Sequence, residues 1–216
     1  MDYLLPLKKR KVIAEKTLGL WFDIADIDFA FKAGQNVDLN SERTFTIASS
    51  PNDSKSIMIA WRTSDSAFKK RFSKVPIGTK VKVSKPIGSF VLHKNHERDT
   101  VFIAGGIGIT PAFSMIKWAT EEKLPHRMTL LYSNGSAKSA VFLSELRQLE
   151  KENREFTLLN SLGRLSVDFV NDAIKRLVDP IFYISGPEEM VASIREMLED
   201  LGIDDFSIKS EEFTGY

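Results

Sequence analysis

The sequence contains no cysteine among its 216 residues. Disulfide bonds, cysteine-ligated iron–sulfur clusters and catalytic thiols are therefore excluded within this chain. Histidine is rare as well, and His93, His96 and His126 are too few and too far apart in the sequence to indicate a metal site. We therefore expect no bound metal.

Long hydrophobic stretches are also absent. No apolar run approaches the roughly 20 residues that a helix needs to cross a bilayer. The N-terminal sequence MDYLLPLKKRK lacks the order of segments typical of a signal peptide. Hydrophobic residues make up 43% and charged residues 27% of the chain, as in ordinary globular proteins. These features predict a soluble cytoplasmic protein without a membrane span.

The net charge of +1 combines two halves of opposite sign. Residues 1–96 carry 17 basic and 9 acidic side chains, a net charge of +8, whereas residues 97–216 carry 13 basic and 20 acidic side chains, a net charge of −7. A change of this size suggests two domains with different electrostatic partners. The length also favours two domains, and we place their boundary between residues 96 and 97.

Short strand-like runs separated by turn residues fill the first half. They cover residues 11–16, 18–24, 43–48, 57–61, 80–84 and 90–92. Only one helix is predicted there, around residues 66–72. This pattern indicates a small antiparallel barrel or sandwich.

Strands and helices alternate in the second half. Apolar strands are predicted at residues 100–104, 128–133, 156–160, 181–185 and 206–209, and helices include residues 166–178 and 188–201. Such alternation predicts an α/β domain with a doubly wound parallel sheet, which binds ligands at the carboxyl ends of its strands.

The stretch VFIAGGIGITP, residues 101–111, joins the first of these strands to a helix. Thr110 is a candidate N-cap, and Pro111 suits the first helical position. Glycines at such a junction let a pyrophosphate approach the backbone, and the helix N-terminus supplies unpaired N–H groups. A tight connection without a ligand is the alternative, because the strict fingerprint G-x-G-x-x-G has Pro111 at its last position.

Several motifs together resemble the plant-type ferredoxin–NADP(H) reductase family. GGIGITP is similar to its pyridine-nucleotide motif, which characteristically has proline there. Arg43-Thr44-Phe45-Thr46 resembles the flavin motif R-x-Y-S/T, and Ser185-Gly186-Pro187 resembles the C/S-G-P motif beside the nicotinamide. The motifs follow the family's order and spacing over nearly the whole chain. The resemblance implies a flavin-binding antiparallel Greek-key β-barrel followed by an NAD(P)-binding α/β domain.

The chemistry of the flavin motif can be read from its residues. An arginine fork pairs with a phosphate, an aromatic ring can stack on the isoalloxazine, and a hydroxyl can form a hydrogen bond near the flavin N5 atom. Alternation along a strand places Arg43 and Phe45 on one face and Thr46 on the other. A local twist is therefore needed to bring all three to one ligand.

Other segments follow the family with departures. Residues 33–35, AGQ, are similar to its P-G-Q turn, and residues 86–90 are similar to G-P-x-G-x-F, with Lys85 in place of the first glycine. Residues 64–66 could hold a flavin phosphate or simply cap the helix. An arginine that commonly grips the 2′-phosphate of NADPH is absent at Gly135, although Lys138 or Arg164 could supply a cation. The choice between NADH and NADPH stays open.

The resemblance implies a set of site residues. The cofactor-binding residues of the barrel are Arg43, Thr44, Phe45, Thr46, Ala60, Trp61, Ser64 and Ser66. Those of the second domain are Gly105, Gly106, Gly108, Ile109, Thr110, Pro111, Ser133, Asn134, Gly186, Pro187 and Phe213. The catalytic residues are Thr46, Ser185 and Tyr216, the last as an aromatic cover over the flavin. The implied cofactors are FAD, with FMN as the alternative, and NADH or NADPH.

The implied function is a hydride relay from NAD(P)H to bound flavin, with electrons passed to a separate acceptor protein such as a ferredoxin, a flavodoxin or an oxygenase component. Basic residues at 8–11 and 69–71, with Lys74, could attract an acidic acceptor, or could form a solvated face that balances flavin phosphates. Nothing in the sequence indicates a nucleic-acid-binding module. Two alternatives stay open: an NAD(P)H:free-flavin reductase, and a non-catalytic flavin-binding subunit of a larger complex.

Overall fold

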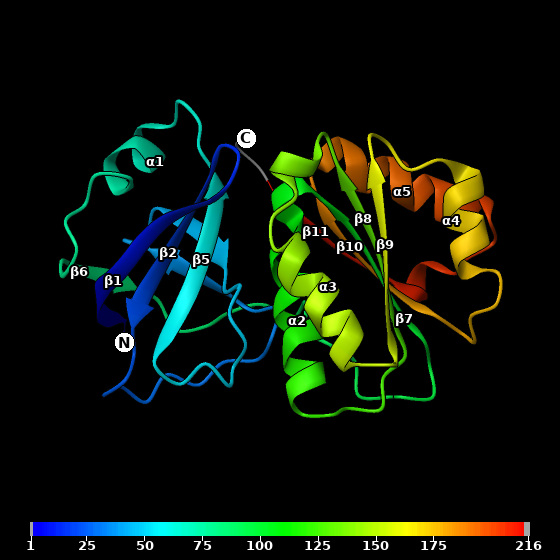
Figure 1. The fold of residues 1–216 in the computed structure, drawn as a ribbon, viewed down its shortest axis with the longest axis horizontal. Helices are drawn as coiled ribbons and strands as arrows, with labels where there is room; N and C mark the ends of the chain where they lie inside the picture. The colour runs from blue at the N-terminus through cyan, green and yellow to red at the C-terminus, as the bar shows by residue number, and fades with distance from the viewer. Residues whose placement is uncertain (1, 214–216) are drawn as a thin grey trace.

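The structure, a computed structural model, describes residues 2–213. Two sheets organise these residues: a six-stranded antiparallel sheet formed by the first part of the chain, and a five-stranded parallel sheet formed by the second. Figure 1 shows the two parts side by side, with helix α2 (Ile109–Glu121) at the junction. The predicted boundary at residues 96/97 falls between the last strand of the first sheet and the first strand of the second.

The antiparallel sheet forms a Greek-key barrel, as predicted. Its elements are β1 (Tyr3–Ala14), β2 (Thr17–Asp23), β3 (Asn36–Leu39), β4 (Arg43–Thr46), β5 (Ser56–Arg62), helix α1 (Ala67–Phe72) and β6 (Lys80–Val83). The strand order is β4-β3-β6-β1-β2-β5, and a bridge between Ile47 and Ile59 joins the two ends. Inward-facing residues such as Leu5, Leu7 and Leu20 are fully buried in the barrel core.

Three expectations for the barrel are wrong. Strand β1 begins at Tyr3 rather than at residue 11, and its Leu5 and Leu7 side chains point into the core by alternation. The four cations at residues 8–11 interrupt the apolar alternation from which a strand is predicted. Strand β3 was not expected. Residues 90–92 are not a strand, since Phe90 lies in the connection between the sheets and packs edge-on against Tyr183.

The parallel sheet is doubly wound, as predicted. Its elements are β7 (Thr100–Gly105), α2, β8 (Met128–Asn134), α3 (Leu143–Glu152), β9 (Phe156–Leu162), α4 (Val167–Ile174), β10 (Ile181–Gly186), α5 (Glu188–Asp200) and β11 (Ile208–Glu212), with 3-10 turns η1 (Gly106–Gly108), η2 (Ala137–Ser139) and η3 (Asp205–Ser207). The strand order is β11-β10-β7-β8-β9. The chain adds β8 and β9 on one side of β7 and then β10 and β11 on its other side, so the direction of strand addition reverses between β7 and β10. Ligands bind at such a reversal, outside the carboxyl ends of the strands.

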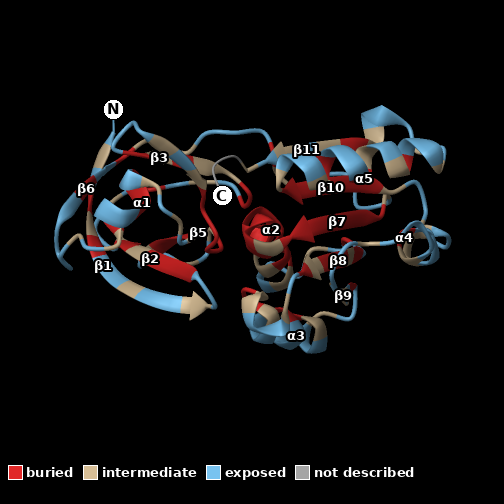
Figure 2. Ribbon diagram, turned by 90° about the horizontal axis from the view of Figure 1, so that it is seen from above, coloured by how far each residue is buried: buried red, intermediate tan, exposed pale blue. Residues whose placement is uncertain are grey.

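Helices cover both faces of the parallel sheet. On β7, Phe102 and Ala104 pack toward α2 and α3, whereas Val101 and Ile103 pack toward α4 and α5. Figure 2 shows the buried strands between these two layers and α2 between the sheet and the barrel. Two boundaries differ from expectation: α4 ends at Ile174 rather than at residue 178, and the last strand begins at Ile208 because residues 205–207 form η3.

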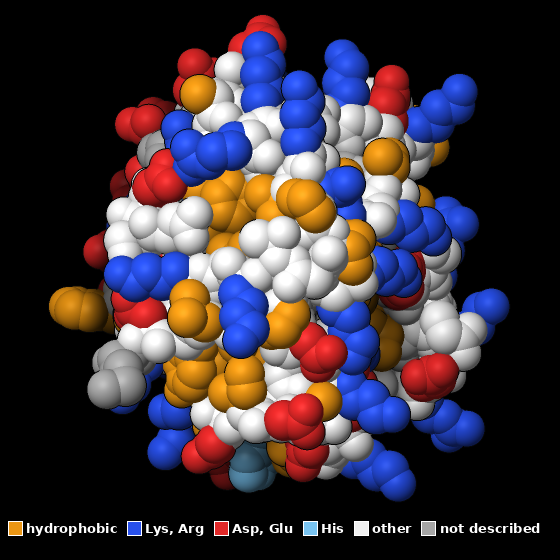
Figure 3. All heavy atoms as spheres, turned by 90° about the vertical axis from the view of Figure 1, so that its left-hand side faces the viewer, with side chains coloured by type: hydrophobic (Ala, Val, Ile, Leu, Met, Phe, Trp, Pro, Cys, Tyr) orange, Lys and Arg blue, Asp and Glu red, His pale blue; other side chains and the backbone are white. Residues whose placement is uncertain are grey.

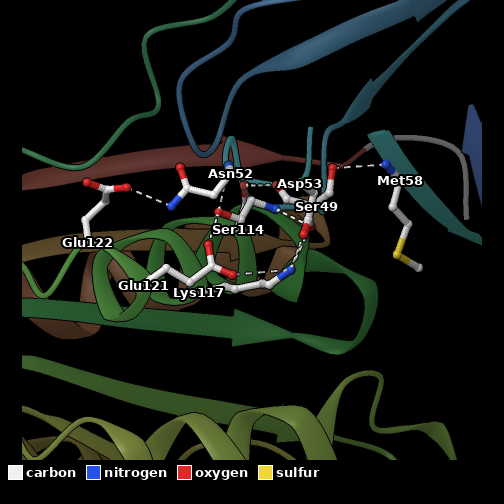
Figure 4. Close-up of polar contacts among 9 residues, drawn as sticks. Ser49, Asn52, Asp53, Met58, Ser114, Lys117, Glu121 and Glu122 are labelled. Atoms are coloured by element: carbon white, nitrogen blue, oxygen red, sulfur yellow. Dashed lines mark hydrogen bonds and ion pairs between the residues drawn. The ribbon is translucent and has the colours of Figure 1, made fainter. Parts of the chain in front are cut away.

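Polar contacts fix α2 to the barrel (Figure 4). The Ser114 hydroxyl donates to the Ser49 carbonyl oxygen over 2.7 Å, and the Lys117 ammonium lies 2.6 Å from the Asp53 carboxylate. Met58 and Phe90 of the barrel and its connection belong to the same hydrophobic cluster as the inner face of α2. The position of α2 relative to the barrel is therefore set by both apolar and polar contacts.

The three histidines, distant in sequence, lie close together in space. The ring centroids of His93 and His126 are 5.1 Å apart, and those of His96 and His126 are 6.4 Å apart. Within residues 2–213, no group of three potential ligands is placed to hold a metal ion. No helix in that part of the chain combines the length and the apolar character needed to span a membrane. The cellular location stays a prediction.

Candidate functional site

A cavity of about 860 Å³ opens between the barrel and the parallel-sheet domain. This volume lies in the range of small-molecule and cofactor sites, roughly 300–1,000 Å³. Strands β3, β4 and β5 and helix α1 form its barrel side, and η1, α2 and the end of β11 form the other side. The predicted site residues that line it are Arg43, Thr44, Phe45, Thr46, Ala60, Trp61, Thr110 and Phe213.

Strand β4 brings the three chemically active residues of the flavin motif to this one cavity. Arg43 and Phe45 share a face of the strand by simple alternation. The strand ends at Thr46, and the next residue, Ile47, forms a bridge with Ile59 of β5. Thr44 and Thr46 line the cavity together with Arg43 and Phe45, although alternation alone would place them on the other face of the strand.

An aromatic cluster supports Phe45 from behind. Its ring centroid lies 5.0 Å from that of Trp61 and 5.7 Å from that of Phe68, and Phe68 stacks in turn on Phe72. Offset and tilted pairs of this kind stabilise a ring position beyond simple burial. Phe45 is therefore held half-buried in the cavity wall, where a planar ring could pack on it.

The hydroxyl of Thr46 is the clearest sign of a missing partner. Thr46 is 5% exposed, and its Oγ1 atom is buried with no hydrogen-bond partner among the residues described. A buried hydroxyl left unpaired costs about 1–3 kcal/mol. A ligand with a polar ring edge in the cavity would satisfy this atom, so the residues present fit a flavin.

Glu211, on β11, is a cavity residue that the motifs did not identify. The Asn36 amide donates to its Oε1 atom over 2.5 Å, while its Oε2 atom is buried without a partner in the described part of the chain. Burial raises the pKa of this carboxyl, and the hydrogen bond from Asn36 opposes the shift. The two residues lie in different sheets and meet only where the end of β11 packs against the barrel, so no local pattern could have revealed the contact.

The turn after β7 is shaped by glycine for packing reasons. Gly106 has a φ of +54°, in the left-handed region, and its carbonyl oxygen accepts a hydrogen bond from the Tyr132 hydroxyl over 3.0 Å. A Cβ atom on Gly108 would lie 2.3 Å from the Ser185 carbonyl oxygen. The end of β10 therefore occupies the space that a side chain at position 108 would need.

The start of helix α2 differs from expectation. The 3-10 turn η1 runs directly into the helix, so α2 begins at Ile109 and Thr110 is already its second residue. Thr110 is not the N-cap, and its hydroxyl donates to the Ile107 carbonyl oxygen over 3.2 Å. Pro111 still lies in the first turn, where its missing N–H group has no helical partner to lose.

Ser185 lies at the reversal point of the sheet. It is 1% exposed, and its hydroxyl donates to the Gly108 carbonyl oxygen over 2.7 Å. This bond ties the turn η1, after β7, to the end of β10. The structure thus gives Ser185 a positioning contact, and its predicted contact with nicotinamide stays a prediction.

The remaining predicted binding residues lie outside the cavity wall: Ser64, Ser66, Gly105, Gly106, Gly108, Ile109, Pro111, Ser133, Asn134, Gly186 and Pro187. Many of them form the carboxyl edge of β7, β8 and β10. Asn134 ends β8 and is buried, and its side chain interacts with the Tyr132 hydroxyl. Tyr216 lies outside the described residues.

Comparisons with known proteins agree with this geometry. Residues 102–196 match the oxidoreductase NAD-binding domain family. The chain is 33% identical over 147 residues to flavohemoprotein A of Dictyostelium discoideum, covering 64% of this chain and 36% of that one. It is 32% identical over 131 residues to methane monooxygenase component C of Methylosinus trichosporium, covering 58% of this chain and 38% of that one.

The same fold occurs in solved structures. The flavohem-like FAD/NAD binding domain of nitric oxide dioxygenase from Vibrio cholerae superposes with a TM-score of 0.82 at 21% identity, covering 99% of both chains. The chain also shares its fold with the ferredoxin–NADP⁺ reductase of Plasmodium falciparum, with a TM-score of 0.81 at 15% identity, covering 98% of this chain and 96% of that one. It spans less than two fifths of the length of the two relatives named above.

Proposed function

We propose that this chain is an NAD(P)H-dependent flavin oxidoreductase that passes electrons to a separate acceptor protein. The single observation that carries the proposal is the unpaired, buried Thr46 hydroxyl in a cofactor-sized cavity that the barrel and the NAD-binding domain share. FAD is the favoured flavin because similar structures are described as binding it.

Residues of the chain would position the flavin in defined ways. Arg43 would pair with a phosphate, Phe45 would pack on the ring system, and Thr46 Oγ1 would form a hydrogen bond with the ring edge. Glu211 would present Oε2 to the cavity, where burial raises the pKa of its carboxyl and so shifts it toward the neutral form. When bound, the flavin supplies the ring that accepts a hydride and releases electrons singly.

The nucleotide would bind at the carboxyl ends of β7, β8 and β10. The N–H groups at the start of α2 and the glycine backbone of η1 suit a pyrophosphate. Asn134, at the end of β8, would contact a polar group of the nucleotide. Thr110, in both the helix start and the cavity wall, lies where the two sites meet.

The proposal of a separate protein acceptor rests on relatives that are named as components of oxygenases: methane monooxygenase component C and the reductase component of propane 2-monooxygenase. Basic side chains are spread over the barrel end of this molecule (Figure 3). Several of those expected to attract an acceptor are already paired: Lys8 with Asp23, and Lys70 with Asp65. We propose that the acceptor is acidic and that Lys11 and Lys74, for which no ion pair is found in the described part of the chain, contribute to its approach.

An anaerobic titration tests the reductase function. Purified protein, saturated with FAD and freed of excess, is mixed with NADH or NADPH while its visible spectrum is recorded. We expect a yellow protein that one of the two nucleotides bleaches at about one equivalent. A yellow protein that neither nucleotide reduces would contradict the proposal. A colourless protein that oxidises nucleotide only when flavin is supplied would indicate the free-flavin reductase instead.

A further inference from the structure

A second cavity, of about 610 Å³, lies between the barrel and helices α2 and α3. Strands β1, β2 and β5 and the loop of residues 49–55 form its barrel wall, and α2 and the start of α3 form the opposite wall. Among residues 2–213, none lines both this cavity and the first one. The volume lies in the range of small-molecule sites, and a flavin in the first cavity would leave this one open.

The barrel wall of this cavity is apolar, whereas the outer face of an antiparallel sheet is commonly solvated. Ile13, Trp21 and Met58 line the cavity, while Leu20, the strand neighbour of Trp21, is buried in the barrel core. Gly19 makes room for two of them, since a Cβ atom there would lie 2.9 Å from the Met58 Cε atom and 3.0 Å from a ring atom of Trp21. The Trp21 ring is only half-buried, so it can still contact a ligand.

Two stacked phenylalanine rings form the opposite wall. Phe113 of α2 and Phe142, directly before α3, have ring centroids 4.1 Å apart and an interplanar angle of 9°. Phe142 has a φ of +60°, in the left-handed region, which is costly for a bulky side chain. The cavity therefore has aromatic rings on both sides, and a planar aromatic ring suits such walls.

Two lysines of β1 add positive charge to the barrel wall. Lys9 and Lys11 pair in the sheet with Trp21 and Gly19 of β2, and the Lys9 ammonium lies 4.6 Å from the centre of the Trp21 ring. Neither lysine forms an ion pair with an acidic side chain of residues 2–213. Both side chains are exposed, so they can turn toward a charged group in the cavity.

The acidic residues of the lining leave this charge uncompensated. The Asp53 carboxylate is engaged by the Lys117 ammonium over 2.6 Å, as Figure 4 shows. The other two charged residues, Lys55 and Glu145, are of opposite sign. With four lysines and two acidic residues, the lining carries a net charge of +2, which an anion would complement.

We propose that this second cavity binds a small planar aromatic anion, such as an arene carboxylate. Its ring would pack between Trp21 and the stacked rings of Phe113 and Phe142, and the ammonium groups of Lys9 and Lys11 would contact its carboxylate. The cavity is separate from the proposed flavin cavity, so the proposal does not depend on the proposed function.

Calorimetric titration with 2-naphthoate tests the proposal, and 2-naphthamide serves as the uncharged probe with the same rings. FAD, NAD⁺ and NADP⁺ are present in excess, so that the proposed cofactor sites are occupied. We expect one binding site per chain and a preference for 2-naphthoate over 2-naphthamide of roughly 3- to 30-fold, the range for two partly exposed ion pairs.

Variants of the lysines test the origin of this preference. The double substitution Lys9→Met and Lys11→Met should weaken 2-naphthoate binding by the same roughly 3- to 30-fold and change 2-naphthamide binding less than about twofold. Lys80→Met combined with Lys85→Met is the matched control, because it removes two exposed lysines outside the cavity. It should leave both dissociation constants within about twofold of the wild type.

Trp21→Leu tests the contact with the ring. It should weaken both probes by roughly 2- to 10-fold, the value of one aromatic pair, and circular dichroism confirms that each variant is folded. Three outcomes would overturn the proposal: no binding of 2-naphthoate, binding that the cofactors abolish, or equal weakening by the two double-lysine variants. Failure of the protein to bind FAD would contradict the proposed function alone.

Discussion

At the scale of single residues, the cavity keeps polar atoms that the folded protein does not satisfy. Most buried polar groups are hydrogen-bonded, so each exception calls for a reason. Thr46 Oγ1 and Glu211 Oε2 are such exceptions, and both residues line the cavity. An unsatisfied polar atom destabilises the ligand-free protein, and a ligand that forms a hydrogen bond with it removes that cost.

The Thr46→Val substitution tests this reading. Because the hydroxyl has no partner in the described protein, its removal should leave the free energy of unfolding unchanged or raise it by up to about 1 kcal/mol. Flavin affinity should fall by roughly 2- to 10-fold, the value of one neutral hydrogen bond. Chemical denaturation of the flavin-free protein and flavin titration measure the two quantities.

A matched threonine provides the control. Thr17 is 1% exposed, and its hydroxyl donates to the Glu15 carbonyl oxygen over 3.0 Å. Thr17→Val should therefore lower stability by about 1 kcal/mol and leave flavin affinity unchanged. If Thr46→Val destabilised the flavin-free protein as Thr17→Val does, the hydroxyl would have a structural partner and the argument would fail.

The sequence predicted only part of the cavity at this scale. Arg43, Phe45 and Thr46 could be found because they form one short motif on one strand. Lys69 was read as part of a basic surface, because a run of three cations does not show which member a helix turns inward. The aromatic residues on either side decide that rotation, and their packing is tertiary.

At the scale of elements, the turn η1 after β7 and the end of β10 form one packed unit. Gly108 and Ser185 are 77 residues apart in sequence, yet a hydrogen bond and a close backbone approach join them. The motif resemblance predicted a glycine needed by a bound pyrophosphate. The structure shows that Gly108 is needed by strand β10, whether or not a ligand is present.

The Gly108→Ala substitution should therefore act on stability. Its Cβ atom would lie 2.3 Å from the Ser185 carbonyl oxygen and 2.6 Å from the Gly186 Cα atom, and neither backbone can yield without moving β10. We expect the free energy of unfolding to fall by about 1–3 kcal/mol or more, as for overpacked interiors. Urea denaturation without cofactors measures the change.

Gly135→Ala is the control, because no heavy atom lies within 4 Å of a Cβ atom built there. It should leave stability within about 0.5 kcal/mol of the wild type. Equal free energies of unfolding for the Gly108→Ala and Gly135→Ala proteins would contradict the packing argument. Contact with a ligand would then be the remaining reason for glycine at position 108.

The prediction of strands succeeded where a strand is buried on both faces. The buried strands β7, β8 and β10 read as continuous apolar runs, and the predicted positions agree with the structure to within one or two residues. Strand β3 was missed because only Val37 and Leu39 face inward over its four residues. It is a strand because it pairs with β4, to which a tight turn joins it, and with β6, which is distant in sequence.

At the scale of the whole molecule, the segment between β6 and β7 links the two sheets, and the three histidines lie close together along it. His93 lies in this connection, its backbone N–H donates to the Tyr183 hydroxyl over 2.8 Å, and its Nε2 atom lies 2.8 Å from Thr100 Oγ1. His126 reaches back to the His93 carbonyl oxygen over 2.9 Å. These contacts fasten the connection to the base of the parallel sheet, while α2 fastens the barrel to its side.

This arrangement makes stability depend on pH near neutrality. Burial, with smaller effects from His126, Lys209 and Arg98, lowers the pKa of His93 from 6.5 to about 4. The unfolded chain therefore takes up a proton at His93 below about pH 6.5, while the folded protein does not until about pH 4. Protonation favours the unfolded state in that window, so the free energy of unfolding should fall as the pH is lowered.

Urea denaturation at pH 7.5 and pH 5.5 tests this dependence in the wild-type and His93→Gln proteins. We expect the wild type to lose on the order of 1 kcal/mol from His93, a value discounted because the ring is only partly buried. His93→Gln should be less stable at pH 7.5 but show a smaller loss between the two pH values. If His93→Gln protein lost as much stability between pH 7.5 and pH 5.5 as the wild type, protonation of His93 would not be the cause of the pH dependence.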